Sequence, residues 1–208
     1  MSVIAVIFDL GGVIVRTENP QPRRKLAEDL GMTDQALSEL VFSSETARLA
    51  TLGKVTTQTH WEAVRAALKL DEVQYRRVPI EFWGGDSLDL ELVNYLRSLR
   101  PRYKTGLLSN AWDDLRGVLT QEWKIADAFD EMIISAEVGL AKPDRRIYRL
   151  AAEKLGVAPG EAVFVDDFID NVQGALQAGM QAVHFRGPEQ ALGELAAILD
   201  HRDGYGPD

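Results

Sequence analysis

The stretch that most constrains the fold is residues 3–15, with the sequence VIAVIFDLGGVIV. Residues 3–8 form an unbroken apolar run rich in β-branched side chains, which is typical of a strand buried on both faces of a parallel sheet. The run ends at Asp9, where a buried carboxylate is costly unless something uses it. Open α/β sheets bind ligands at the carboxyl ends of their strands. Asp9 therefore either caps a turn or serves a functional site.

Length and composition narrow the classes of protein that fit. The 208 residues suit one domain, with or without an inserted subdomain. A net charge of -9 argues against nucleic acid and membrane partners, because neither anionic surface would be neutralised. The absence of cysteine excludes disulfides and thiolate metal sites. No apolar stretch approaches the ~20 residues of a membrane span, and we expect a cytoplasmic protein that is a monomer or a homodimer.

Residues 17–84 carry helical signals and no convincing strand. Capping residues and apolar spacing predict helices at residues 22–30, 33–42, 45–52, 56–68 and 71–78, the last of them ended by Pro79. An all-helical block directly after the first strand predicts an inserted cap subdomain, placed as a lid over the strand ends.

From residue 85 onward, predicted helices and strands alternate. Short apolar strands are expected at residues 105–108, 132–135, 162–165 and 181–185. Helices are expected at residues 87–99, with Ser87 as N-cap, and at 115–121, 143–155, 169–178 and 188–199. The alternation predicts an α/β fold with a parallel sheet and helices on both faces. Residues 1–16 and 85–208 would form this core, and residues 17–84 the cap.

Polar residues stand at the predicted strand ends and before one helix; they are Asp9, Ser109, Asn110, Lys142, Asp166 and Asp167. Each also has a structural explanation, as a turn, a solvated helix start or a helix cap. In a doubly wound sheet, however, these positions converge on one edge. Their repeated occurrence at such positions predicts a single site.

The charges of such a site point to phosphoryl chemistry. Three neighbouring carboxylates cannot all ionise without compensation, and Lys142 supplies one positive charge. Mg²⁺ suits the remaining negative charge, because it binds one or two carboxylates together with waters and phosphate oxygens. Ser109 and Lys142 can bind phosphoryl oxygens, and an aspartate can attack phosphorus to give an aspartyl-phosphate.

The motifs IFDLGGVIV, LLSN, AKPDRRIY and VFVDDFIDN together resemble those of the haloacid dehalogenase-like (HAD) hydrolase superfamily, and the resemblance covers nearly the whole chain. It implies a Rossmann-like three-layer core, strand order 3-2-1-4-5 and a helical cap inserted after the first strand. It also implies a phosphatase that acts on a small phosphorylated molecule with Mg²⁺ as cofactor.

The resemblance assigns a role to each candidate residue. Asp9 would be the nucleophile and a metal ligand, and the backbone carbonyl of Gly11 would be a second ligand. Asp167 would bind the metal directly, while Asp166 would hold metal-bound water. The phosphoryl group would be bound by Ser109, Asn110 and Lys142, and Lys142 would also steady the nucleophile.

Gly11 departs from the family pattern. The family's phosphatases usually carry a second aspartate at this position, and it protonates the leaving group. The sequence is similar to a small-sugar-phosphate phosphatase branch that reads DLGG or DLGN, and to the amino-terminal phosphatase domain of epoxide hydrolases, which keeps DLDG. Loss of a general acid typically lowers the rate by about 10²–10⁴-fold. Aryl phosphates and anomeric sugar phosphates are therefore expected to react faster than alkyl phosphates, with Thr17 or Glu18 as candidate substitute acids.

Two other functions fit the same residues. A 2-haloacid dehalogenase also uses an aspartate nucleophile and needs no acid for a halide, but it requires no metal and leaves the Asp166–Asp167 pair without a role. The second alternative, suggested by Gly11, is a catalytically weak protein that uses the HAD fold for binding.

Overall fold

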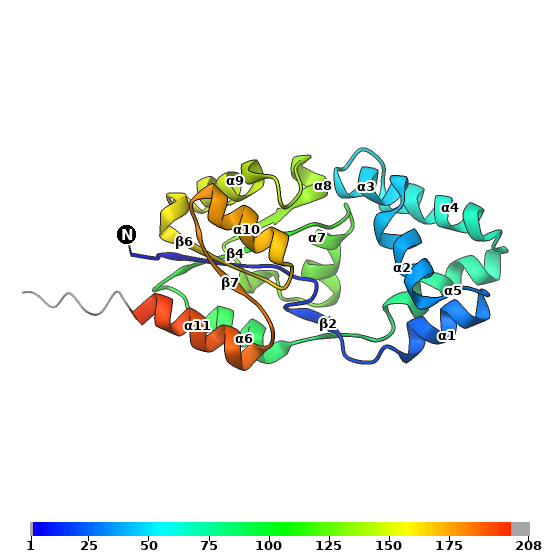
Figure 1. Ribbon diagram of the computed structural model, residues 1–208, viewed down its shortest axis with the longest axis horizontal. Coiled ribbons are helices and arrows are strands. Elements are labelled where there is room, and N and C mark those ends of the chain that lie inside the picture. Colours follow the sequence, from blue (N-terminus) through cyan, green and yellow to red (C-terminus); the bar gives the residue numbers. More distant parts are fainter. Residues whose placement is uncertain (1, 201–208) are drawn as a thin grey trace, which may run out of the picture.

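The computed structural model describes residues 2–200, so residues 201–208 of the predicted core lie outside the described chain (Figure 1). Five parallel strands form a sheet in the order β5-β4-β1-β6-β7. Counted along the chain, this is the predicted order 3-2-1-4-5, and the α/β class is confirmed. The strands are β1 (Ala5–Phe8), β4 (Lys104–Ser109), β5 (Glu131–Ile134), β6 (Ala162–Asp166) and β7 (Gln181–His184).

Helices cover both faces of the sheet, because the side chains of β1 alternate between two apolar clusters. Val6 and Phe8 belong to the cluster that includes Leu92 and Leu195, while Ile7 packs in a second cluster with Ile147. Figure 1 accordingly shows α9 and α10 on one side of the sheet and α6 and α11 on the other. These helices are α6 (Leu90–Ser98), α9 (Arg145–Leu155), α10 (Ile169–Ala178) and α11 (Pro188–Asp200); shorter helical segments are α7 (Leu115–Gly117) and α8 (Ser135–Val138).

Five helices follow the first strand, and α1, α2, α4 and α5 among them pack around an apolar cluster that includes Leu37, Trp61 and Phe82. We call all five the cap helices. Figure 1 places them beyond the carboxyl end of β1. Side chains of Thr33, Ser44 and Thr56 accept the capping hydrogen bonds that begin three of these helices. Their bounds are α1 (Gln21–Asp29), α2 (Asp34–Ser43), α3 (Glu45–Thr51), α4 (Thr57–Leu68) and α5 (Glu72–Trp83).

The prediction that Pro79 ends a helix is wrong, because α5 continues through it to Trp83. Proline removes one backbone hydrogen bond and normally costs about 3 kcal/mol inside a helix. Val78 and Phe82 are both buried among the cap helices, and burial of such side chains stabilises by about 1.5–3 kcal/mol each. Burial of these two side chains together offsets the free-energy cost of the proline.

Two short strands at the base of the cap helices were not predicted. The strands β2 (Val15–Thr17) and β3 (Asp86–Leu88) pair antiparallel, with Arg16 opposite Ser87. Ser87 therefore does not begin the following helix; Asp89 does, since its Oδ1 accepts from the backbone N–H of Leu92 at 2.8 Å. Strands of three residues are too short to show an alternating pattern in sequence.

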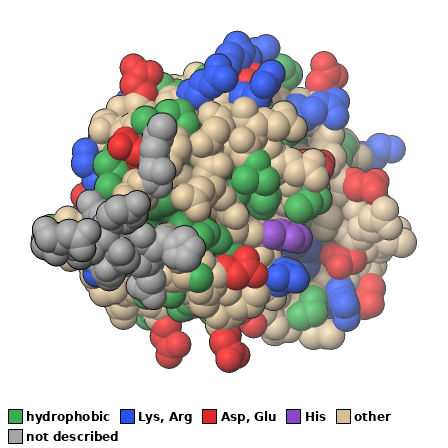
Figure 2. Space-filling model, turned by 60° about the vertical axis from the view of Figure 1, so that its left-hand side comes forward, with side chains coloured by type: hydrophobic (Ala, Val, Ile, Leu, Met, Phe, Trp, Pro, Cys, Tyr) green, Lys and Arg blue, Asp and Glu red, His purple; other side chains and the backbone are tan. Residues whose placement is uncertain are grey.

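In Figure 2 acidic and basic side chains both occur across the face shown, and neither sign dominates it. Within residues 2–200, none of the helices has the length and apolar character needed to cross a bilayer.

Candidate active site

The carboxyl ends of β1 and β6 bring three carboxylates together. Asp9 follows β1, Asp166 ends β6, and Asp167 comes next. One oxygen of each side chain lies within 4.8 Å of the others. The strands run in register, with Phe8 level with Val165, so the positions after them meet at one edge.

Lys142 lies between two of these carboxylates. Its Nζ is 2.7 Å from Oδ1 of Asp9 and 2.7 Å from Oδ2 of Asp166. All three side chains are buried, and the lysine is only 5% exposed. Charges removed from water must be paired, and hydrogen bonds between charged groups are among the strongest in proteins. The structure therefore brings the lysine and the acids into one ionic cluster.

Asp166 is held firmly from within the core. Its Oδ1 accepts from the backbone N–H of Phe168 at 2.7 Å, and the Asn171 side-chain amide lies 3.1 Å from both of its oxygens. The backbone carbonyl of Asn171 in turn accepts from the buried Tyr148 hydroxyl at 2.8 Å. Sequence reasoning assigned no role to Asn171 or Tyr148. The position of Asn171, in the first turn of the helix after the aspartate pair, is the signal that would have identified it.

The electrostatics of the cluster favour a bound cation. Burial raises the pKa of Asp9 to about 7, against the lowering effect of Lys142, and the charge of Asp166 also raises it. Burial and the charge of Asp166 raise the pKa of Asp167 as well. One ammonium group does not compensate three neighbouring carboxylates. This donor set fits a hard divalent cation, and Mg²⁺ is suited to a site with few carboxylates.

Ser109 and Asn110 lie at the end of β4, which neighbours β1 in the sheet. Ser109 is buried. The Asn110 side chain pairs with the backbone of Lys142: Nδ2 donates to its carbonyl at 2.9 Å and Oδ1 accepts from its N–H at 2.8 Å. Asn110 thus fixes the backbone that carries the lysine, a contact that the sequence did not predict. One amide N–H of Asn110 remains for a ligand.

The two glycines after Asp9 have different surroundings. A Cβ atom at Gly11 would meet nothing within 4 Å, so this position opens onto space. A Cβ atom at Gly12 would lie 2.0 Å from Oδ2 of Asp167, and Gly12 has a φ of +78°. Gly12 is therefore required both for its backbone conformation and for the close approach of the Asp167 carboxylate.

Gly12→Ala is expected to displace the Asp167 carboxylate. The strained φ should lower the free energy of unfolding by about 1–3 kcal/mol, and if Asp167 is the metal ligand that the sequence predicts, its misplacement should weaken Mg²⁺ binding by about 10–100-fold. Urea unfolding and calorimetric titration with Mg²⁺ measure the two effects. Gly11→Ala is the matched control, with near-native values expected. Equal Mg²⁺ affinity in both variants would contradict a ligand role for Asp167.

The two candidate substitute acids are engaged elsewhere. The Thr17 hydroxyl donates to Oδ1 of Asp86 at 2.6 Å across the β2–β3 pair. The exposed Glu18 carboxylate accepts from Nε of Arg16 at 3.2 Å. Both residues lie at the base of the cap helices, and the structure gives neither a contact with the ionic cluster.

Comparisons with known proteins agree with this geometry. The model of the haloacid dehalogenase-like hydrolase family matches residues 4–179. A protein named phosphatase MT3486, from Mycobacterium tuberculosis, is 28% identical over 240 residues that cover 100% of both chains. Bifunctional epoxide hydrolase 2 from Sus scrofa is 29% identical over 218 residues, which cover 95% of this chain but only 39% of the porcine protein.

A solved structure shares the fold. The HAD family enzyme BT-2542 from Bacteroides thetaiotaomicron, in complex with magnesium and inorganic phosphate, superposes with a TM-score of 0.71 at 21% identity. The match covers 88% of this chain and 93% of that one.

Proposed function

The chain belongs to the haloacid dehalogenase-like hydrolases, and on that premise we propose that it hydrolyses small phosphomonoesters with Mg²⁺ as cofactor. The observation that carries the proposal is the ionic cluster, in which Lys142 lies 2.7 Å from both Asp9 and Asp166, with the Asp167 carboxylate beside them. The name of the mycobacterial relative and the magnesium and phosphate in the BT-2542 complex support it.

In the proposed reaction Asp9 is the nucleophile. One of its carboxylate oxygens forms a bond to phosphorus, the P–O ester bond breaks, and its electron pair leaves with the organic group. Water then attacks the aspartyl-phosphate and releases inorganic phosphate. Lys142 lowers the repulsion between the Asp9 carboxylate and the incoming phosphoryl dianion, because its ammonium already touches that carboxylate. Ser109 and the free amide N–H of Asn110 would bind phosphoryl oxygens.

Asp9, Asp167 and the carbonyl of Gly11 would hold Mg²⁺. Asp166 is better placed as an outer residue that holds metal-bound water, because Lys142 and Asn171 already occupy its oxygens. The cation would supply positive charge to the phosphoryl oxygens.

The missing acid at Gly11 restricts the leaving group. An aryloxide, or the anomeric oxygen of a sugar phosphate, leaves without full protonation more readily than a plain alkoxide. We propose that residues 1–16 and 85–208 form the catalytic core and that residues 17–84 form a cap that selects among such substrates.

Phosphate release from p-nitrophenyl phosphate tests this function. Turnover should fall by more than about 10²-fold when EDTA removes the metal and return with Mg²⁺, since the cation neutralises the transferring group. A beryllium fluoride complex should form at Asp9 only when Mg²⁺ is present. The same samples should be tested for chloride release from 2-chloropropionate.

The outcomes separate the three functions. Chloride release that survives EDTA would identify a dehalogenase instead. A protein that shows neither turnover nor a Mg²⁺-dependent beryllium fluoride complex would be a binding protein, and the phosphatase proposal would be wrong.

A further inference from the structure

Large apolar side chains are exposed directly beside the aspartate pair. Phe168 is 61% exposed and Ile169 is 47% exposed, although both immediately follow Asp167 in the chain. Phe168 precedes α10, and its backbone N–H is fixed by Asp166 at 2.7 Å. The backbone of Phe168 therefore lies beside the ionic cluster on a rigid support. Apolar surface left in water at such a place is typical of a binding surface.

The cap helices present exposed aromatic rings as well. Phe42 and Trp83 are 46% and 40% exposed, and their ring centroids are 5.5 Å apart. Trp83 is 6.3 Å from the ring of Trp112. Trp112 comes three residues after Ser109, so their Cα atoms are at most about 11 Å apart. This aromatic surface is thus continuous with the loop that carries the proposed phosphoryl-binding residues.

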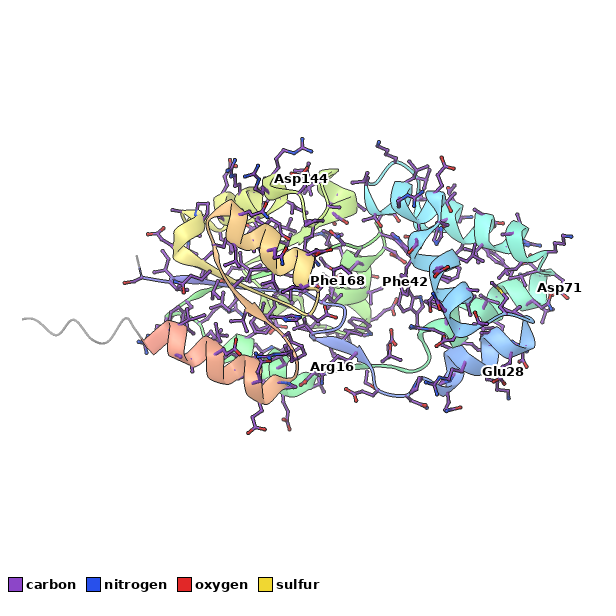
Figure 3. All side chains as sticks on the ribbon, in the orientation of Figure 1. Arg16, Glu28, Phe42, Asp71, Asp144 and Phe168 are labelled. Atoms are coloured by element: carbon purple, nitrogen blue, oxygen red, sulfur yellow. The ribbon has the colours of Figure 1, made fainter. Side chains whose placement is uncertain are left out.

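One residue of each apolar surface is labelled in Figure 3. Figure 3 labels Phe168 on the side of the core toward the cap helices, and Phe42 on the side of the cap helices toward the core. We call Phe42, Trp83, Phe168 and Ile169 the apolar rim. Apart from the indole N–H of Trp83, the rim side chains offer only hydrocarbon, and they give the hydroxyl groups of a sugar little to bind.

Arg23, whose guanidinium lies over a rim ring, is already paired with a carboxylate. The guanidinium of Arg23 lies over the rings of Phe82 and Phe42, at 4.3 and 5.9 Å from their centroids. It also contacts the Asp86 carboxylate at 3.4 Å. Arg23 thus packs against the aromatic surface and is neutralised by Asp86, so it leaves little positive charge for a second anion.

Resting on the phosphatase function above, we propose that the organic part of the substrate is an aromatic ring, and that the protein hydrolyses aryl phosphate monoesters. Two independent observations support an aromatic leaving group. The rim provides aromatic and aliphatic surface for a ring beside the phosphoryl site, and Gly11 supplies no acid, which an aryloxide leaving group does not need. The phosphoryl group moves to Asp9, and the aryloxide departs with the P–O electron pair and takes its proton from water.

Four substrates separate ring binding from leaving-group chemistry, each assayed with Mg²⁺: 2-naphthyl, benzyl and cyclohexyl phosphate, and glucose 1-phosphate. 2-Naphthyl phosphate should have the highest kcat/KM. Benzyl phosphate keeps a ring but has an alkyl leaving group, so its KM should stay low while its kcat falls by about 10²-fold or more. Gly11→Asp should reduce this kcat difference, because position 11 opens onto space.

Rim variants test the binding surface. Phe168→Ala and Trp83→Ala should each raise the KM for 2-naphthyl phosphate by about 10-fold or more, as expected for loss of a large apolar contact. The matched controls are Leu176→Ala, exposed on α10, and Ile80→Ala, exposed on α5. Both controls should keep the native KM.

The results distinguish this inference from the function on which it rests. Preference for glucose 1-phosphate or cyclohexyl phosphate, or a KM that rim variants change no more than the controls do, would overturn the aryl substrate class while Mg²⁺-dependent turnover stands. Failure of all four substrates, together with no beryllium fluoride complex, would overturn both.

Discussion

Replacing Asp9 with Asn is expected to lower kcat/KM for phosphomonoesters by at least about 10⁴-fold, because loss of a covalent nucleophile, the role proposed for Asp9, has such effects in other enzymes. The amide is a poor nucleophile and cannot give the acyl phosphate. The change is nearly isosteric, and it removes a carboxylate whose pKa burial raises to about 7. The fold should therefore persist, and steady-state kinetics alongside circular dichroism measure the two properties separately.

The control for this variant is Asp170→Asn, the same change on an exposed carboxylate of α10. It should leave turnover near the native value. A beryllium fluoride complex should form in native protein and in Asp170→Asn but not in Asp9→Asn, since beryllium takes the place of phosphorus and bonds to the carboxylate oxygen of the proposed nucleophile. Near-native turnover in Asp9→Asn would place the nucleophile elsewhere and refute the mechanism.

The acids of the site could be predicted because strand topology alone decides where they lie. Residues 5–8 and 162–165 are apolar runs with little ambiguity, and both strands are fully buried. Once two such strands are parallel neighbours, the residues that follow them meet at one edge whatever their side chains do. Asp9, Asp166 and Asp167 needed no further information. Lys142 follows no strand directly; it was assigned to the same edge because it precedes the helix that connects β5 to β6.

The contacts that orient these groups could not be predicted, because they depend on side-chain direction and on the packing of distant segments. The sequence predicts that Asn110 lies in a turn or binds the phosphoryl group. In the structure its side-chain amide pairs with the backbone of Lys142. The ring of Trp112, which follows Ser109 by three residues, packs 4.7 Å from the buried His60 of a distant helix. Neither contact follows from the period of a strand or a helix.

Lys142→Met is expected to damage both catalysis and stability. Loss of the ammonium leaves Asp9 and Asp166 buried without the cation that each contacts at 2.7 Å. Removing one partner from a buried ionic group costs about 3–5 kcal/mol, which urea unfolding in EDTA measures. Turnover with Mg²⁺ should fall by at least about 10³-fold, because a preorganised charge at the reacting group often contributes this much.

The double variant Lys142→Met with Asp166→Asn separates these two effects. If the instability arises from an orphaned carboxylate, neutralising Asp166 should restore much of the lost unfolding free energy, since apolar or neutral replacements of buried ion pairs are often tolerated. Asn171 can still donate to the new amide oxygen from its position 3.1 Å away. Turnover should stay low, because no ammonium then faces Asp9. Recovery of turnover without recovery of stability would contradict the proposed catalytic role of Lys142. It would show that Lys142 serves the fold rather than the phosphoryl group.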